Sequence, residues 1–505
     1  MASPPHKKSA SSARRRDRIS DLTDEVLGHV LSFLPTKEAG CTAILGRRWR
    51  DIFRSVHTIK FEEAEGEREE DWFTDHWESA DKRSCSGVLL DCISSALLRH
   101  RIRCASDRSG HPVPLRSFHF AFDSYDNWDK VAVDQWLFEV LCQSDKKELH
   151  LDLRFFIGPI CSDDDDEKNE NKKWGYVLPM TLFSHTAIRT LCLGHCKLNL
   201  PESIDLPLLK TLRLTSILGD DSEETTQRLI CSCPRLLDLT LEANKRLKRI
   251  TILDKRLRRF ALRCCHNMTK VIIDASELRS LEYNGMVPKE SLMSLGVSPG
   301  LASCTIRFCR VGHEESELLG FRRFMEKVCD SKHLNLHHFG LVEGGFFTSF
   351  PSFFGLKSLE LQGPVQSRET VDMIRRIMEH TPNLEVLSLY MELDPQTPQT
   401  QLDDELDEDG DEKEYERSVV LDNLRVPDDE SSFSMHCLRR RVKEINMVNY
   451  EYDVYHRTLA WLLFRNALVL ERMCVVLRKG QLTFQSKLKE EIESWLVTKP
   501  EKSFM

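Results

Sequence analysis

The pattern L-x-x-L-x-L, with aliphatic or aromatic variants, recurs through the middle of this 505-residue chain and restricts its fold more than any other feature. The middle residues of nine copies advance by 21, 27, 21, 21, 23, 35, 20 and 28 residues. The copies are Ile188-Leu191-Leu193, Leu209-Leu212-Leu214, Leu236-Leu239-Leu241, Leu257-Phe260-Leu262, Leu278-Leu281-Tyr283, Leu301-Cys304-Ile306, Leu336-Phe339-Leu341, Leu356-Leu359-Leu361 and Leu384-Leu387-Leu389. Because alternate side chains of a strand share a face, each L-x-L predicts a short strand with two core-facing side chains. The regular step predicts a repeat solenoid.

The residues that follow the strands support this interpretation. Cys196, Asn244, Cys265 and Cys309 each stand three residues after a strand, where leucine-rich repeats, which the pattern resembles, place Asn or Cys inside the bend. This position gives these cysteines a structural role. Segments such as 224–231 and 371–380 predict helices for the convex side. An ordinary α/β sheet with leucine-rich strands is the alternative, but the regular step and the Asn/Cys position favour the solenoid.

The stretch from Asp17 to Phe53 has a different, helical spacing of apolar residues. A wide stripe runs from Val26 to Leu34, and Pro35 ends it, because proline cannot continue a helix. Thr23 and Thr36 are the expected N-caps of the first and second helices, and a third helix carries Trp49. A unit of this length is too small to bury its apolar surface alone, which predicts a partner.

The order of residues in this stretch, D-R-I-S-x-L-x-D-E-V-L-x-x-V-L-S-F-L-P-T-K-E-A followed by R-R-W-R, resembles the F-box in its plant form. The resemblance implies docking to a Skp-type adaptor, and through it to a cullin-RING scaffold of an SCF ubiquitin ligase. The matching positions, expected to bind the adaptor, are Leu22, Val26, Leu27, Val30, Leu31, Leu34, Pro35, Ile44, Leu45, Arg48 and Trp49. The family usually has Leu-Pro where this chain has Leu22-Thr23, so we expect weaker pre-organisation of the first helix.

Two more strand patterns, Val442-Ile445-Met447 and Leu470-Met473-Val475, continue the rhythm near the C-terminus. Helices are expected at 458–467 and 486–496, and the surrounding sequence resembles the FBD region of plant F-box proteins. The expected fold class is α/β: a small three-helix F-box followed by a leucine-rich-repeat horseshoe with a strand and a helix in each repeat. The expected domains are a disordered basic tail (1–16), the F-box (17–60), a linker (61–84), repeats (85–393, with an acidic loop at 162–173), an acidic disordered loop (394–417) and FBD-like terminal repeats with a cap (418–505).

Composition excludes several classes of protein. The net charge is -9, and the segment 403–416, with ten carboxylates and one lysine, accounts for it, so no basic field predicts nucleic-acid binding. No apolar run of 18 residues predicts a membrane span, and no secretory signal is recognisable. The seventeen cysteines contain no C-x-x-C pair, which indicates reduced thiols inside the cell, in the nucleus, the cytoplasm or both. Basic pairs in the tail are compatible with a nuclear address. The four aspartates at 163–166 lack EF-hand spacing.

The sequence offers no recognisable catalytic, nucleotide or metal motif, so no catalytic residue, metal or cofactor is expected. His337-His338 flanks a strand, where a surface role is expected. The chain is interpreted as the non-catalytic substrate-recognition subunit of an SCF-type ligase, with an unknown target protein. The alternatives are a scaffold with a degenerate F-box and a repeat receptor that also senses a small molecule through residues such as Arg263, Arg307 and Tyr283; an enzyme is the least supported reading.

Overall fold

The structure is a computed structural model of the 505-residue chain. It describes residues 18–19, 21–54, 56–62, 79–106, 114–122, 130–146, 148–156, 161, 175–253, 256–289, 292–296, 300–309, 315–338, 341–342, 345–392, 435–451, 453–478, 486–490 and 495. The predicted basic tail, the acidic loops at 162–173 and 394–417, and residues 418–434 therefore lie outside the described residues. No helix in the described part of the chain is long and apolar enough to cross a membrane.

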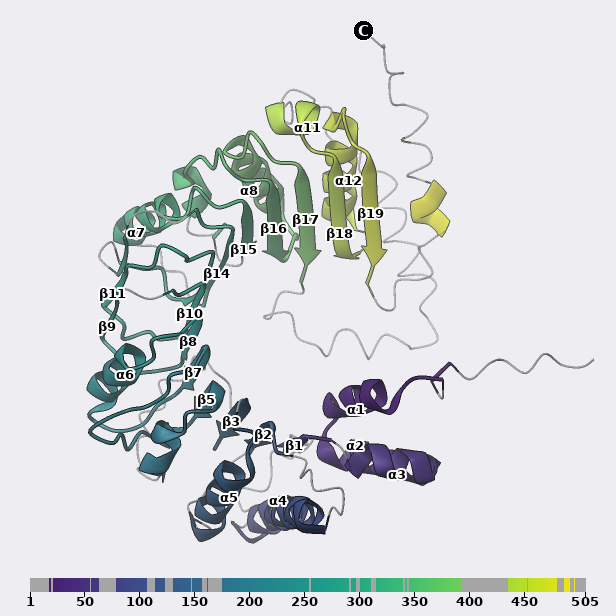
Figure 1. Ribbon diagram of the computed structural model, residues 1–505. Helices are drawn as coiled ribbons and strands as arrows, with labels where there is room; N and C mark the ends of the chain where they lie inside the picture. The colour runs from purple at the N-terminus through teal and green to yellow at the C-terminus, as the bar shows by residue number, and fades with distance from the viewer. Residues whose placement is uncertain are drawn as a thin grey trace, which may run out of the picture. The chain divides into compact units, whose positions relative to one another are not determined.

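The chain divides into two compact units, of which the first comprises residues 1–157 and 187–189. Its helices α1 (Asp24–Ser32), α2 (Thr36–Cys41) and α3 (Arg47–Arg54) are joined by a 3₁₀ turn, η1 (Thr42–Leu45). The strands β1 (Thr58–Glu62), β2 (Ser117–Ala121) and β3 (Leu149–Arg154) pair in parallel, in that order. The helices α4 (Ser79–Ser106) and α5 (Lys130–Gln143) lie beside one another below these strands (Figure 1). Phe118 and Phe120 in β2 and Leu149, Leu151 and Leu153 in β3 are buried.

The structure corrects three details of this unit. Thr23 precedes α1 in an extended backbone, but its side chain makes no capping hydrogen bond; its carbonyl oxygen instead accepts from Leu27 N, at 3.0 Å. Thr36 is the first residue of α2 rather than its cap, and its hydroxyl accepts from the backbone N–H of Lys60, at 2.7 Å, which ties α2 to β1. The expected linker is shorter, because β1 continues to Glu62 and α4 already begins at Ser79.

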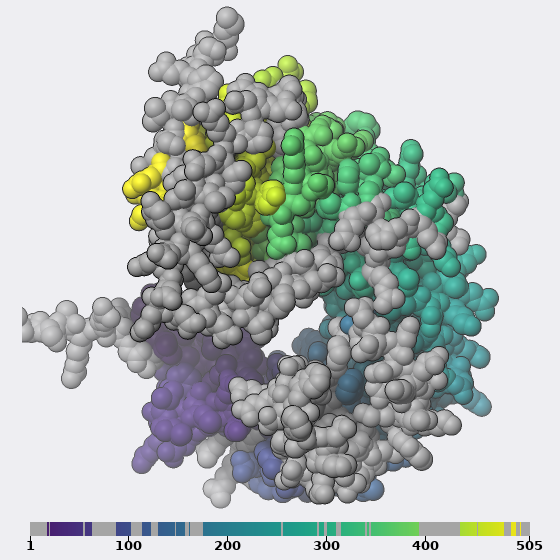
Figure 2. Space-filling model, turned by 180° about the vertical axis from the view of Figure 1, so that it is seen from behind, coloured from purple at the N-terminus to yellow at the C-terminus, as the bar shows by residue number. Residues whose placement is uncertain are grey.

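The second unit contains residues 158–186 and 190–505 and is built on one parallel sheet. Its strands follow one another in chain order, and Figures 1 and 2 show this succession from teal to yellow. They are β5 (Ile188–Gly194), β7 (Thr211–Thr215), β8 (Asp238–Glu242), β10 (Arg259–Arg263), β12 (Ser280–Gly285), β14 (Ser303–Phe308), β15 (His333–His337), β16 (Ser358–Gly363), β17 (Val386–Met391), β18 (Glu444–Tyr450) and β19 (Arg472–Leu477). The L-x-L side chains are buried in nearly every strand, as expected; in the last strand, β19, Met473 and Val475 are half-buried.

Helices cover the outer side of this sheet in some repeats only (Figure 1). They are α6 (Ser222–Cys231), α7 (Glu315–Glu326), α8 (Arg368–Glu379) and α12 (Val454–Asn466), with a short α11 (His436–Arg440). Between β8 and β14, three short strands replace the helix: β9 (Arg249–Ile252), β11 (Lys270–Ile273) and β13 (Met293–Leu295), which form their own parallel sheet. The prediction of a helix in every repeat was therefore wrong. These repeats advance by only 21 to 23 residues, too few for a helix with its connections, and stretches such as Lys-Val-Ile-Ile favour a strand.

The predicted repeat Leu336-Phe339-Leu341 was placed in the wrong register. The strand is β15, and its inward residues are Leu334 and Leu336, which are 1% and 0% exposed. Ser331 occupies the position of the outer leucine, and it is fully buried there although it is polar. The intervals from β14 to β15 and from β15 to β16 become 30 and 25 residues, counted from Cys304 to Leu334 and then to Leu359. The final predicted helix is described only at 486–490 and 495.

The bends after the strands repeat as regularly as the strands. His195, Ser216, Ala243 and Cys264 each come directly after a strand and have φ values of 48° to 54°. Asn244, the next residue after one of these, is buried and bridges two segments: its Nδ2 donates to Leu214 O and its Oδ1 accepts from Ile217 N, both at 2.8 Å. The expected role of Asn244 inside the bend is confirmed. Cys196 and Cys265 are also buried at this position, whereas Cys309 is half-exposed.

Candidate functional site

The helices of the F-box-like stretch share a small core of their own. Its buried members are Leu27, Leu31, Ala39, Ile52 and Val56, and Leu34, Trp49 and Phe53 pack against them with part of their surface in solvent. The wide stripe on α1 is therefore divided: one half, Leu27 and Leu31, faces this core. The structure corrects the assignment of these two residues, because side chains that are 1% and 2% exposed have no surface left for an adaptor. They position the helices instead.

The other half of the stripe and the 3₁₀ turn are open to solvent. The exposed large apolar side chains, with their exposed fractions, are Ile19 (58%), Leu22 (39%), Val26 (45%), Val30 (47%), Phe33 (69%), Ile44 (84%) and Leu45 (68%). We call this set the docking face. Five of its members were predicted from the sequence, whereas Ile19 and Phe33 were not. Phe33 stands at the end of α1, with its ring against that of His29 at 4.8 Å, where the spacing of the stripe gave no reason to separate it from the core.

Arg48 joins the two parts of the docking face. Its Nε donates to Asp24 Oδ1 at 2.8 Å, and its Nη2 donates to the carbonyl oxygen of Leu22. The beginning of α1 is thereby held next to the turn that follows η1, where Gly46 takes a φ of 157° and a ψ of 179°, a conformation suited to glycine. The guanidinium was predicted to contact the adaptor, and the structure shows it bound within the unit, with the side chain 41% exposed. Asp24 also lies in the first turn of α1, where its negative charge interacts favourably with the positive end of the helix dipole.

The inner face of the repeats carries a ladder of paired charges. Glu242 on β8 accepts from Arg213 on β7 and from Arg263 on β10, and Arg263 also donates to Glu282 on β12, at 2.6 and 2.9 Å. On the same strands, Asp238 and Arg259 form a second, bidentate pair at 2.8 and 2.7 Å. These groups neutralise one another, so this part of the face is polar yet nearly balanced in charge.

The pKa directions follow from this ladder. Burial by itself raises the pKa of the Glu242 carboxyl, but the hydrogen bond and charge of Arg213, with contributions from Thr215 and Arg263, outweigh it and lower the pKa below its ordinary value. The Arg263 guanidinium has a raised pKa, first because of its hydrogen bond with Glu282. Both groups are therefore charged at neutral pH.

The residues suggested for a small-molecule pocket do not converge. Tyr283 is 5% exposed and faces the core, and its hydroxyl donates to Met286 O at 2.6 Å. Arg263 is engaged by its two carboxylates, and Asn284 stands between Arg263 and Arg307 in the register of the strands. The prediction of a pocket built on these three residues is therefore not supported.

His337 and His338 diverge in their surroundings. The His338 ring is 2% exposed, and a Cβ added to Gly363 would lie 2.7 Å from it, so the two positions are packed together. Burial lowers the pKa of His338 to about 4. His337 is half-exposed, so the expected surface position holds for this residue only in part, and not for the buried His338.

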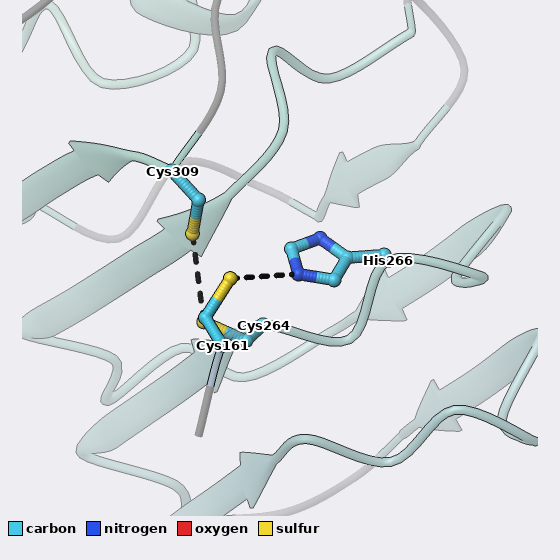
Figure 3. A group of neighbouring side chains, drawn as sticks. All are labelled: Cys161, Cys264, His266 and Cys309. Carbon is cyan, nitrogen blue, oxygen red and sulfur yellow. Dashed lines mark hydrogen bonds between the residues drawn. The ribbon is translucent and has the colours of Figure 1, made fainter. Parts of the chain in front are cut away.

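One cluster was not predicted from the sequence: Cys161, Cys264, His266 and Cys309, whose sulfur and nitrogen atoms all lie within 4.8 Å of one another (Figure 3). The hydrogen bond with Cys264 is the main cause that lowers the pKa of the Cys309 thiol, to about 7, and the same contact raises the pKa of Cys264. Cys309 thus faces this cluster rather than the inside of the bend, which corrects its predicted role. The only hint in the sequence is the Cys264-Cys265 pair, of which the bend needs one member.

Two known protein families match parts of this chain, one in each unit. The F-box domain matches residues 19–61, and the repeats described as those of the FBD-associated F-box protein At5g56370 match residues 167–302. Among similar Arabidopsis thaliana proteins, F-box/LRR-repeat protein At1g06630 is 27% identical over 282 residues, covering 53% of this chain and 59% of that protein. FBD-associated F-box protein At4g10400 is 29% identical over 270 residues, covering 53% and 55%.

A third relative, putative F-box protein At1g58310, is 30% identical over 240 residues, covering 45% of this chain and 41% of that protein. The chain therefore spans about half the length of the curated relatives it matches. Together with the three-helix unit and the parallel repeat sheet, these matches confirm the predicted resemblance: the chain contains an F-box followed by leucine-rich repeats of the type found in plant FBD-associated F-box proteins.

Proposed function

We propose that this chain is a substrate-recognition subunit of an SCF-type E3 ubiquitin ligase, acting in the nucleus, the cytoplasm or both. The F-box docks on a Skp-type adaptor, which connects it to a cullin-RING scaffold, and the repeats bind a target protein. The observation that carries the proposal is the docking face: the described F-box residues share a cluster of five buried side chains, and seven of their large apolar side chains remain 39% to 84% exposed.

The energetics of this face favour a protein partner. Exposed apolar patches of this kind mark interaction surfaces, because burial of apolar area contributes about 25 cal/mol per Å². Ile44 and Leu45 are adjacent on η1 and, together with Phe33, are the most exposed residues of the face, so these three have the most area to lose to an adaptor. The salt bridge of Arg48 with Asp24 fixes the geometry before binding, which reduces the entropy that ordering would otherwise cost.

The proposed mechanism is proximity and needs no catalytic residue in this chain. The repeats hold the target, and the ubiquitin-loaded enzyme at the far end of the scaffold reaches lysines of the target at a raised effective concentration. The Leu22-Thr23 variation does not oppose this, since α1 begins at Asp24 with the carbonyl of Thr23 bonded to Leu27 N as in a regular helix.

Co-purification with a Skp-type adaptor tests the proposal on the full-length chain. Ile44→Glu places a charge at the most exposed residue of the docking face and is expected to weaken adaptor binding at least about tenfold, a loss of about 1.4 kcal/mol. Val131→Glu is the matched control, because Val131 on α5 is 77% exposed and lies outside the F-box. Both variants should keep the circular dichroism of the wild type.

Two outcomes contradict the proposal. Undiminished adaptor binding by Ile44→Glu would show that the docking face is not the contact. A wild-type chain that binds no adaptor would favour the second candidate, a scaffold whose F-box has lost its partner, for which the missing proline at position 23 is the motivating observation.

A further inference from the structure

A second site lies in the repeat unit, where the edge of the sheet brings together three thiols and one imidazole (Figure 3). Cys264 follows β10 in the left-handed turn with a φ of 50°, and His266 is two residues further along the same bend. Cys309 follows β14, two strands away, and its N–H donates to Gly285 O of the intervening β12 at 2.9 Å. Cys161 comes from a segment far earlier in the sequence. Three separate parts of the unit therefore meet at one point.

The distances within this cluster are those of a ligand set. The sulfur atoms of Cys264 and Cys309 are 3.5 Å apart, and the Cys161 sulfur is 3.3 Å from His266 Nε2. A tetrahedral zinc ion, with Zn–S bonds of about 2.3 Å and Zn–N bonds of about 2.0–2.1 Å, separates its ligand atoms by roughly 3.3 to 3.8 Å. The widest separation in the cluster is within 4.8 Å, so a metal ion requires the ligands to close by about 1 Å at most.

We propose that Cys161, Cys264, His266 and Cys309 form a Cys₃His site that binds one zinc ion. Three thiolates and one imidazole select zinc among the common divalent ions, since calcium and magnesium prefer oxygen ligands. An iron–sulfur cluster normally takes four cysteines or a paired-histidine set, which the group does not supply. Four protein ligands leave no open coordination position, so the site is structural rather than catalytic.

The surroundings agree with a metal site of this kind. The four ligands differ in burial: Cys264 is buried, whereas Cys161 and His266 are exposed. An ion can therefore reach the site from solvent, while Cys264 is held in the core. In the thiol form Cys309 donates to Asn284 Oδ1 at 3.0 Å; a zinc-bound Cys309 thiolate has no such proton, so the Asn284 amide would present its N–H₂ group to the sulfur instead. Arg307, exposed and two residues before Cys309, provides a positive charge near a centre that carries a net charge of -1.

The ion would join Cys161 to the bends of two repeats, which contribute Cys264 with His266 and Cys309. Binding of zinc displaces the three thiol protons and joins parts of the chain that are distant in sequence, so the metal-bound form is more resistant to unfolding.

The experiment is a measurement of metal content on the full-length chain, purified under reducing conditions without chelators. We expect about one zinc per chain by elemental mass spectrometry. Replacement of zinc by Co²⁺ should give the strong near-ultraviolet thiolate absorption and the visible bands of tetrahedral cobalt. Cys309→Ser and His266→Gln should each reduce bound zinc at least tenfold at micromolar free zinc. Cys474→Ser, which changes an exposed cysteine on β19, is the matched control and should retain the full content.

His266→Gln keeps the test decisive if Cys309→Ser does not fold, because His266 is exposed. A wild-type chain that takes up no Zn²⁺ or Co²⁺ while all its thiols react would overturn the proposal. So would a disulfide between Cys264 and Cys309 in protein purified without reductant, or full zinc content in both ligand variants. None of these results bears on adaptor binding, which is measured separately.

Discussion

A substitution at Glu242 that hardly changes the shape of the side chain can measure how much the charged ladder contributes to the free energy of unfolding. The Glu242 carboxylate is 1% exposed and accepts from Arg213 Nε and Nη2, at 3.1 and 2.5 Å, from Thr215 Oγ1 at 2.9 Å and from Arg263 Nη1 at 3.3 Å. The replacement Glu242→Gln keeps the shape of the side chain and removes its charge. Arg213 then loses its carboxylate partner, and an amide N–H₂ group faces guanidinium donors.

The expected loss follows from the burial of the partners. Breaking a fully buried ion pair costs about 3–5 kcal/mol, because one charge is left without compensation. The side chains of Arg213 and Arg263 are each 30% exposed, so water recovers part of this cost, and Arg263 keeps its 2.6 Å contact with Glu282. We therefore expect Glu242→Gln to lower the free energy of unfolding by about 2–3 kcal/mol at pH 7.

The pH dependence provides a second readout with a defined sign. The pKa of Glu242 is lower in the folded chain than its ordinary value of 4.5, so its contribution is complete above that value and is lost as the pH falls through the folded pKa. The difference in stability between the wild type and Glu242→Gln should be constant from pH 8 to about pH 6 and should shrink below about pH 4.5.

Urea unfolding followed by circular dichroism and hydrogen exchange of the repeats from β7 to β12 would measure the effect. The control is Asp238→Asn on the same strand, whose side chain is 21% exposed and pairs with Arg259, itself 69% exposed. Because the Arg259 side chain lies mostly in solvent, this pair is expected to contribute less than the Glu242 contacts, about 1 kcal/mol. Equal losses in the two variants, or unchanged exchange around β8 in Glu242→Gln, would refute the argument that burial makes the ladder stabilising.

Two further changes test the bends and the buried ring. Asn244→Ala leaves Leu214 O and Ile217 N without their 2.8 Å partners inside the bend, and should cost about 2–4 kcal/mol in urea unfolding, whereas a loss below about 1 kcal/mol would mean that the bend closes without them. His338 has a folded-state pKa of about 4, below its ordinary 6.5, so the unfolded chain binds the proton first and stability should fall by up to about 3 kcal/mol between pH 6.5 and pH 4. His338→Gln should remove this part of the acid sensitivity in thermal unfolding, and an identical pH profile would contradict it.

The repeat strands show what periodicity predicts and where it fails. Where the outer position is a buried leucine, as at Leu209 and Leu356, the three-residue pattern places the strand correctly. At β15 the outer position is Ser331, which is fully buried. Because serine is polar, the L-x-x-L-x-L pattern cannot be recognised in this repeat. The second leucine of the true strand, Leu336, also begins the false pattern. A single polar substitution at a buried position was enough to shift the predicted register.

The thiol–imidazole cluster was beyond the reach of spacing for a different reason. Metal motifs are recognisable in sequence when the ligands lie on one short loop, but here a solenoid supplies them from bends two strands apart and from Cys161. Cys264 and Cys309 occupy successive positions of the bend in their repeats, one residue out of phase with each other. Only the stacking of β10, β12 and β14 brings their sulfur atoms to 3.5 Å.

The docking face was predicted only in part, because a sequence pattern and the packing of the helices both decide which side chains are exposed. Val26 and Leu27, or Val30 and Leu31, are neighbours of similar size and hydrophobicity, and the stripe they form on α1 is too wide for the core of a unit this small. The sequence alone therefore implies that part of the stripe needs a partner. It cannot say which part, because that depends on the side from which α3 packs, and Arg48, bound to Asp24 and Leu22 O, fixes that side. The outcome is that Leu27 and Leu31 belong to the core, whereas Val26, Val30 and the η1 residues stay exposed and, under the proposed function, are the side chains that an adaptor would cover.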